Sequence, residues 1–171
     1  GAVPVFVDVD ERTWLMQTPA DPWEIRQLPV SLYGLHDSTE GKFAYPYRWT
    51  IDDAAQTLRT TGSAAFTSYS FQASKILALG EGGMLVTDDE ALATRAREFS
   101  SLGYRMRADQ PRIDPATIKS PTFERHHSLG WNYRMNDITA MLGLERLKLA
   151  DKLLEERRLC ASLYADAIKD C

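Results

Sequence analysis

Short apolar runs alternate with longer stretches of helical spacing along the 171 residues of this chain, and this alternation limits what it can fold into. Runs rich in β-branched, aromatic or other apolar residues predict strands at 3–9, 28–34, 64–71 and 83–87. Apolar residues at helical spacing predict helices after residue 87, from about residue 135 and from about residue 151. Strands that alternate with helices bury their apolar faces in layers, so the sequence predicts an α/β fold.

Local signals indicate where two of these helices begin and end. Residues 87–90 have the spacing of a capping box, and Gly103 is placed to end the helix that follows. Asn136 or Asp137 can cap the next helix through a side-chain oxygen. The polar, proline-bearing segment 104–128 lies between them, which predicts a long surface loop of the kind that often carries function.

Composition argues against several kinds of partner. The formal net charge is −4, whereas binding to nucleic acid phosphates normally needs a basic surface. No apolar run approaches the roughly 20 residues of a transmembrane helix, and no basic-then-apolar signal peptide is seen. Cys160 and Cys171 are too few for a disulfide framework or a metal site. We therefore expect a cytoplasmic protein that uses no metal and binds neither nucleic acid nor a membrane.

Lys75 lies between an aromatic strand and a glycine-rich turn, in Ser68-Tyr-Ser-Phe-Gln-Ala-Ser-Lys75-Ile-Leu-Ala-Leu-Gly-Glu-Gly-Gly83. The chemistry of pyridoxal phosphate (PLP) needs a lysine amine that forms an imine and then moves the substrate proton. Neighbouring hydroxyls and backbone N–H groups suit the cofactor phosphate. Taken alone, however, a lysine after a strand is more often a surface residue, so other residues must decide.

Asp52 and Asp53 are followed by two alanines and then Gln56. A PLP enzyme needs one carboxylate against the pyridinium nitrogen, because a protonated ring is the better electron sink. Two small side chains leave room for a flat ring close to the backbone. The alternative is that the aspartates cap a helix, and the motif in isolation favours this alternative.

Five motifs together resemble one protein family in their order along the chain. They are Pro29-Val-Ser-Leu-Tyr-Gly34, Asp52-Asp-Ala-Ala-Gln56, Ser70-Phe-Gln-Ala-Ser-Lys75, Gly80-Glu-Gly-Gly-Met-Leu-Val-Thr-Asp-Asp89 and Gly130-Trp-Asn-Tyr-Arg-Met-Asn-Asp137. Over nearly the whole chain they are similar to the DegT/DnrJ/StrS family of PLP-dependent nucleotide-sugar aminotransferases. The resemblance implies the PLP-dependent transferase fold of type I, an aspartate-aminotransferase-like α/β/α sandwich with a mostly parallel sheet.

The same resemblance implies a role for each of five residues. Lys75 corresponds to the lysine that holds the cofactor as a Schiff base, and Asp53 to the partner of the pyridinium nitrogen. Gln56 matches the residue that lies against the cofactor ring and its phenolic oxygen, and Ser70 matches a phosphate ligand. Asn132 resembles an asparagine that reaches the phosphate of the neighbouring subunit, which implies a homodimer with shared active sites.

The family's activity implies an amino group transferred from glutamate or glutamine to a keto-sugar linked to a nucleotide. Related dehydratases carry a histidine at the position of Lys75, so the lysine favours amino transfer. Two alternatives stay open. The acceptor is a cyclitol ketone, as in aminoglycoside-type biosynthesis, or the protein is a regulatory homologue that binds PLP or a sugar without catalysis.

Two further residues are candidates for substrate binding. Arg134 is a candidate to contact a nucleotide diphosphate, because a guanidinium matches the geometry of phosphate oxygens. A structural role at the start of a helix is an equally frequent alternative. His127, next to His126, is a candidate for a sugar phosphate, and a plain loop role is the more frequent alternative for such a pair. Cys160 is predicted to lie in the core, and the charged side chains of 152–158 on a solvated helix face.

The resemblance also indicates parts of the family that this chain does not contain. It assigns 1–150 to a PLP-binding large domain that is incomplete at its N-terminus, and 151–171 to a helix leading toward a small C-terminal domain. The family's phosphate loop, and the aromatic residue that stacks on the cofactor ring, are expected upstream of Gly1. The segments 36–48 and 57–63 are shorter than in the family, so we expect joins there between pieces of a longer chain.

Overall fold

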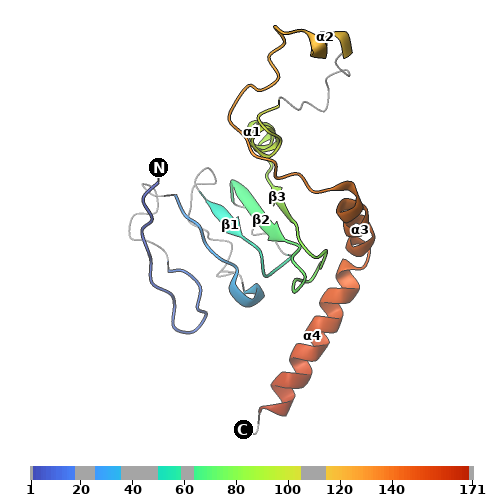
Figure 1. The fold of residues 1–171 in the computed structure, drawn as a ribbon. Coiled ribbons are helices and arrows are strands. Elements are labelled where there is room, and N and C mark those ends of the chain that lie inside the picture. Colours follow the sequence, from blue (N-terminus) through green and yellow to red (C-terminus); the bar gives the residue numbers. More distant parts are fainter. Residues whose placement is uncertain (1, 18–25, 36–49, 59–63, 105–114, 170–171) are drawn as a thin grey trace. The chain divides into compact units, whose positions relative to one another are not determined.

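The computed structural model describes residues 2–17, 26–35, 50–58, 64–104 and 115–169 (Figure 1). They fall into two units that we describe separately, one made of Gly1–Leu85 with Asn136–Cys171 and the other of Val86–Met135. In chain order the elements are η1 (Leu32–Gly34), β1 (Ile51–Asp53), β2 (Phe66–Ser70), β3 (Gly83–Val86), α1 (Glu90–Ser100), α2 (Pro115–Lys119), α3 (Asp137–Leu147) and α4 (Ala150–Ala167).

The three strands form one sheet in the order β1-β2-β3 (Figure 1). β1 and β2 are parallel, and Asp53 is the register partner of Ser68. The chain at 27–30 runs parallel to β1 and pairs with it through the bridges Gln27↔Thr50 and Val30↔Asp53. The predicted strands at 64–71 and 83–87 are therefore confirmed, whereas only the first part of 28–34 is extended before η1 begins.

The strand predicted at 3–9 is wrong. In the described residues this segment makes one isolated antiparallel bridge, between Val9 and Met16, and the side chains of Val3 and Phe6 are exposed. A strand exists only where a neighbouring strand accepts its hydrogen bonds, and apolar composition alone does not supply that neighbour. The turn beside this bridge is held by Asp10, whose pKa is lowered by hydrogen bonds from the backbone and side chain of Thr13.

The helices begin close to where the sequence predicts, with two differences. Asp89 caps α1 by accepting from the N–H groups of residues 91 and 92, so the cap is two residues later than Thr87. The short α2 lies inside the segment that we predicted as loop. The cap of α3 is Asn136, whose Oδ1 accepts from the backbone N–H of Thr139 at 2.9 Å. None of the described helices combines the length and apolar character needed to cross a bilayer.

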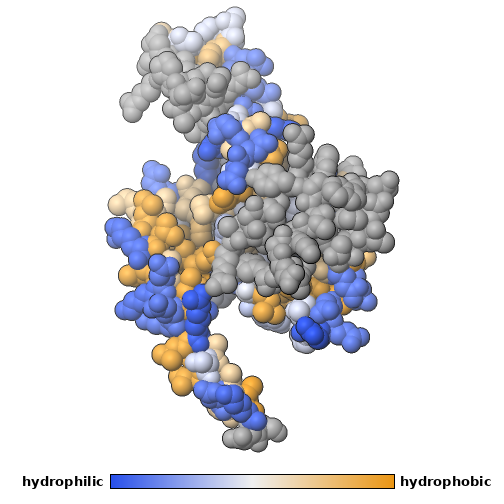
Figure 2. All heavy atoms as spheres, turned by 180° about the vertical axis from the view of Figure 1, so that it is seen from behind, coloured by the Kyte–Doolittle hydropathy of each residue, from blue (hydrophilic) through white to orange (hydrophobic). Residues whose placement is uncertain are grey.

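Among the described residues, none of the buried side chains belongs to the last two helices. The buried apolar residues are Leu15, Ala54, Ala64, Ala65, Phe71 and Leu77. Apolar side chains of α3 and α4 are exposed instead, and orange side chains are visible along α4 in Figure 2. Cys160 is also exposed, so the prediction that it lies in the core is wrong. Helical spacing predicts which face of a helix is apolar, but a second element must cover that face before it becomes core.

Candidate functional site

Lys75 lies in a loop whose two ends are joined by backbone hydrogen bonds. Where β2 ends, the N–H of Phe71 donates to the carbonyl of Gly82 at 2.8 Å, and the N–H of Leu79 donates to the carbonyl of Phe71 at 2.8 Å. Inside the loop, the N–H of Lys75 donates to the carbonyl of Gln72 at 2.9 Å, and Leu77 is buried. Lys75 itself is half-buried. The lysine is therefore held on an anchored loop and is not an ordinary surface residue.

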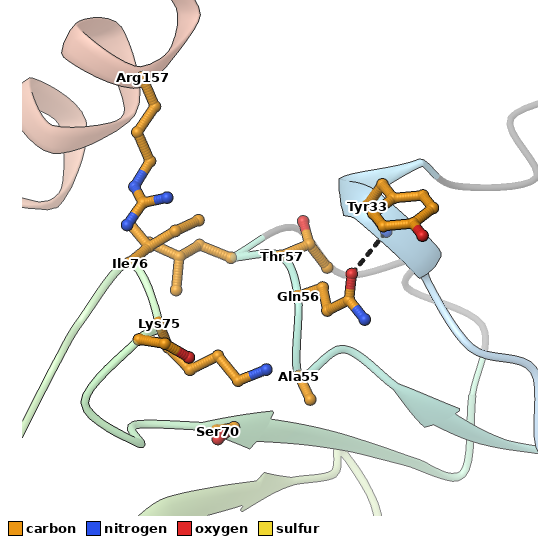
Figure 3. Close-up of a pocket in the computed structure, with 10 residues that line it drawn as sticks. Tyr33, Ala55, Gln56, Thr57, Ser70, Lys75, Ile76 and Arg157 are labelled. Carbon is orange, nitrogen blue, oxygen red and sulfur yellow. Dashed lines mark hydrogen bonds between the residues drawn. The ribbon is translucent and has the colours of Figure 1, made fainter. Parts of the chain in front are cut away.

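The side chain of Lys75 lines a cavity of about 330 Å³ in the first unit (Figure 3). Other parts of that unit contribute Tyr33 of η1, residues 55–58 after β1, Ser70 at the end of β2, residues 74–76 of the loop and Arg157 of α4. Gln56, Ser70 and Lys75, three of the residues predicted to bind a cofactor, thus meet in one pocket. Its volume lies within the range of small-molecule sites, roughly 300–1,000 Å³.

The two neighbouring aspartates of β1 have different surroundings. Asp52 is 1% exposed, and its Oδ1 accepts a hydrogen bond from the hydroxyl of Ser31 at 3.3 Å. Asp53 is only partly buried, and its register partner is Ser68. Because side chains alternate between the two faces of a strand, Asp53 shares its sheet face with Ser68 and Ser70, while Asp52 points to the opposite, buried face.

Asp53 caps a turn and not a helix. Its Oδ1 accepts from the N–H of Ala55 at 3.0 Å, and no helix begins in the described residues 54–58 that follow. The alternative interpretation of this motif, an aspartate pair that caps a helix, is therefore wrong. Ala54 is fully buried and Ala55 lines the pocket, so two small side chains lie between the carboxylate and Gln56.

Gln56 is oriented by a hydrogen bond to η1. Its Oε1 accepts from the backbone N–H of Tyr33 at 2.7 Å, drawn as a dashed line in Figure 3. Tyr33 has a φ of 56°, a left-handed conformation that is uncommon for a large side chain and that this bond helps to hold. Because a backbone N–H can only donate, the amide oxygen must face Tyr33, which leaves the NH₂ group of Gln56 to act as a donor.

The donor set suits the cofactor that the sequence predicts. Ser70 accepts from the N–H of Gln72 at 3.3 Å, which leaves its own hydroxyl hydrogen for a phosphate oxygen. Lys75 supplies the amine, Asp53 a carboxylate on the same sheet face as Ser70, and Gln56 an amide donor for a phenolic oxygen. Ala55 leaves room for a flat ring beside the backbone. These residues fit PLP.

Three of the predicted site residues belong to the second unit. Asn132 forms an antiparallel bridge with Ser101, and the ring of His127 lies 3.8 Å from a carboxylate oxygen of Glu124. Arg134 is exposed. Nδ1 of the neighbouring His126 donates to the carbonyl oxygen of Leu102 at 2.7 Å. The roles of Asn132, Arg134 and His127 stay predictions.

Several residues that line the pocket were not predicted from the sequence, and Tyr33 and Arg157 are the two with the largest polar side chains. Tyr33 lies in the motif Pro29–Gly34. The glycine that follows it indicates a left-handed turn, and both residues do have a positive φ. Arg157 gave no such signal. The prediction that it lies on a solvated helix face is confirmed, since Arg157 is exposed, but its long side chain also reaches the pocket of Lys75.

Comparison with known proteins defines first the fold and then the family. One similar solved structure is PseC of Helicobacter pylori, an aminotransferase involved in the biosynthesis of pseudoaminic acid. It superposes with a TM-score of 0.75 and is 25% identical in sequence. The match covers 99% of this chain and 46% of PseC. The predicted fold class, the α/β fold of PLP-dependent transferases of type I, is confirmed. The model of the DegT/DnrJ/EryC1/StrS aminotransferase family matches residues 1–171, and the chain belongs to this family.

Curated relatives agree with this membership. The spore coat polysaccharide biosynthesis protein SpsC of Bacillus subtilis (strain 168) is 32% identical over 99% of this chain and 46% of its own length. The GDP-perosamine synthase of Escherichia coli O157:H7 is 28% identical over 96% of this chain and 45% of its own length. The chain thus spans about half the length of the relatives that it matches.

Proposed function

We propose that this protein is a PLP-dependent aminotransferase that moves an amino group from glutamate or glutamine to a keto-sugar attached to a nucleotide. The observation that carries the proposal is the shared pocket of Lys75, Gln56 and Ser70, with Asp53 on the same sheet face as Ser70. Membership of the aminotransferase family supports the reaction class, and the names of SpsC, GDP-perosamine synthase and PseC support a sugar as the acceptor.

Lys75, Gln56 and Ser70 of the pocket, together with Asp53, each have a distinct task in this proposal. When bound, PLP supplies an electron sink for the carbon that loses a proton. Lys75 would hold the cofactor through its amine and, once displaced by the amino donor, would take the α-proton as a general base and give it back as a general acid. Asp53 would accept a hydrogen bond from the ring nitrogen and favour its protonated form. Gln56 would donate its NH₂ group to the phenolic oxygen, and Ser70 would donate its hydroxyl to the phosphate.

The remaining assignments concern the partner and the sugar. Asn132 reaches the phosphate bound by a second copy of the chain, so the active enzyme is a homodimer with shared sites. Arg134 and His127 contact the nucleotide-linked sugar. Residues 1–150 belong to the PLP-binding large domain, and 151–171 lead toward a small domain.

The direct test is amino transfer by the full-length gene product. With L-glutamate or L-glutamine as donor, we expect formation of an amino sugar from a nucleotide-linked 4-keto sugar, detected by mass spectrometry. A cyclitol ketone serves as the second acceptor. Transfer to the cyclitol alone would assign the alternative acceptor, and bound PLP without transfer to either acceptor would contradict an enzymatic role and favour a regulatory one.

The two aspartates give a matched pair of substitutions. Asp53→Asn removes the negative charge that favours a protonated ring nitrogen, so we expect turnover to fall on the order of 10²-fold while the cofactor stays bound. Asp52→Asn changes a buried carboxylate that is bonded to Ser31, and we expect lower stability toward urea with smaller loss of turnover per folded molecule. If the large loss of turnover followed Asp52 instead, the assignment of the ring partner would be wrong.

A further inference from the structure

Arg157 reaches the pocket of Lys75 from a distant part of the sequence. It extends from α4, and its side chain lines the same cavity as Lys75, Ser70 and Gln56. In Figure 3 the guanidinium group points toward Ile76, at the opposite side of Lys75 from Ser70. Both α4 and the Lys75 loop belong to the first unit. The pocket therefore contains a second cation besides the lysine.

Arg157 is exposed on α4, and no carboxylate in the described residues pairs with its charge. No aspartate or glutamate is among the described residues that line the pocket, and the guanidinium forms no ion pair in the described part of the chain. Lys152, five residues earlier on α4, does have a carboxylate at 3.9 Å, from Glu156. A cation that faces a cavity without a counter-charge favours an anionic ligand there.

Few other groups of this pocket are available to bind an anion. The hydroxyl of Ser74 donates to Oε1 of Gln72 at 2.6 Å and is therefore already used. Ser70 lies on the other side of Lys75, where the proposed function places the cofactor phosphate (Figure 3). Lys75 is committed to the cofactor. Arg157 is thus the cation left for an anionic group that is not the phosphate.

We infer that Arg157 binds the carboxylate of the amino donor. This inference rests on the proposed function, because any amino-acid donor that reacts beside Lys75 brings a carboxylate into the same cavity. A guanidinium matches the two oxygens of a carboxylate with two parallel N–H groups. Arg157 is therefore a donor-binding residue, contributed by a helix that follows the large-domain core in the sequence.

The experiment compares Arg157→Ala with Arg158→Ala in the full-length gene product. Arg158 carries the same charge on the same helix but does not line the pocket, so it controls for long-range electrostatics and for helix stability. L-glutamate is titrated against the cofactor-loaded protein while the visible absorption is followed. Arg157→Ala should raise the apparent Kd for glutamate about 10-fold or more, with cofactor content unchanged and the Arg158→Ala value at wild type.

Other results would overturn the inference. An unchanged Kd in Arg157→Ala, or an equal rise in both variants, would remove Arg157 as a specific carboxylate ligand. Loss of bound PLP with an unchanged affinity for glutarate, measured by calorimetry, would assign Arg157 to the cofactor phosphate instead. Calorimetry with glutarate, an unreactive dicarboxylate, tests the same subsite without turnover. If the wild-type protein neither holds PLP nor transfers an amino group, the proposed function is wrong. In that case the glutarate affinities of the two variants still decide whether Arg157 binds carboxylates.

Discussion

Replacement of Lys75 by alanine is expected to remove the visible absorption of bound PLP after dialysis and to lower turnover by about 10²–10⁴-fold or more. The range of about 10²–10⁴ is the contribution of a single positioned proton-transfer group, and loss of the covalent attachment adds to this effect. The pocket places the amine beside Ala55, with Gln56 and Ser70 among the other lining residues (Figure 3). No other lysine lines this cavity among the described residues, so no neighbouring amine can replace it.

Two controls separate chemistry from folding in this experiment. Lys152→Ala removes an exposed lysine outside the pocket and should keep both absorption and turnover. Added methylamine should restore part of the turnover of the Lys75→Ala variant, because a free amine can take over proton transfer when the site is otherwise intact. Retention of the absorption band by Lys75→Ala after dialysis would show that another residue holds the cofactor.

Gly103→Ala is expected to destabilise the second unit by about 2–4 kcal/mol in its free energy of unfolding. Gly103 has a φ of +73°, and a Cβ built there would overlap the backbone carbonyl oxygen of Ser128. Its backbone also fixes the surrounding segment, since its N–H donates to the carbonyl of Glu98 and its carbonyl accepts from the N–H of His127. An added methyl group therefore meets backbone atoms that cannot rotate away.

Gly80 provides the matched control for this substitution. Its φ is +87°, but a Cβ there would meet no atom within 4 Å. Gly80→Ala should therefore cost only the left-handed conformation, on the order of 1 kcal/mol. Urea unfolding of both variants, followed by circular dichroism, measures the difference. Equal destabilisation by the two substitutions would contradict a steric role for the contact between Gly103 and Ser128.

Features that depend on neighbouring residues were predictable from the sequence. The aromatic and β-branched residues of 64–71 predicted β2, and Asn136 predicted the start of α3. The order of the short motifs predicted the family, which the match over residues 1–171 confirms, and with the family came the candidate roles of Lys75 and Gln56. The segments near 36–48 and 57–63, where we predicted joins, lie mostly outside the described residues.

Features that depend on distant partners were not predictable in this way. The apolar segment 3–9 has the composition of a strand but lacks a strand beside it in the described residues. Cys160 lies at a spacing typical of a buried face, yet nothing in the described part of the chain covers it. Burial requires a second surface, and the sequence of one segment does not specify which other segment provides it.

The sequence by itself determined the family, the loop of Lys75 and the small residues between Asp53 and Gln56, because each of these is encoded within a few consecutive positions. Tertiary structure alone decided that Asp52 is buried while Asp53 shares a face with Ser70, since register with β2 sets that face. It also decided that Arg157 lines the pocket. Local propensity acts over one or two turns of chain, whereas a pocket is formed by packing between segments that lie tens of residues apart.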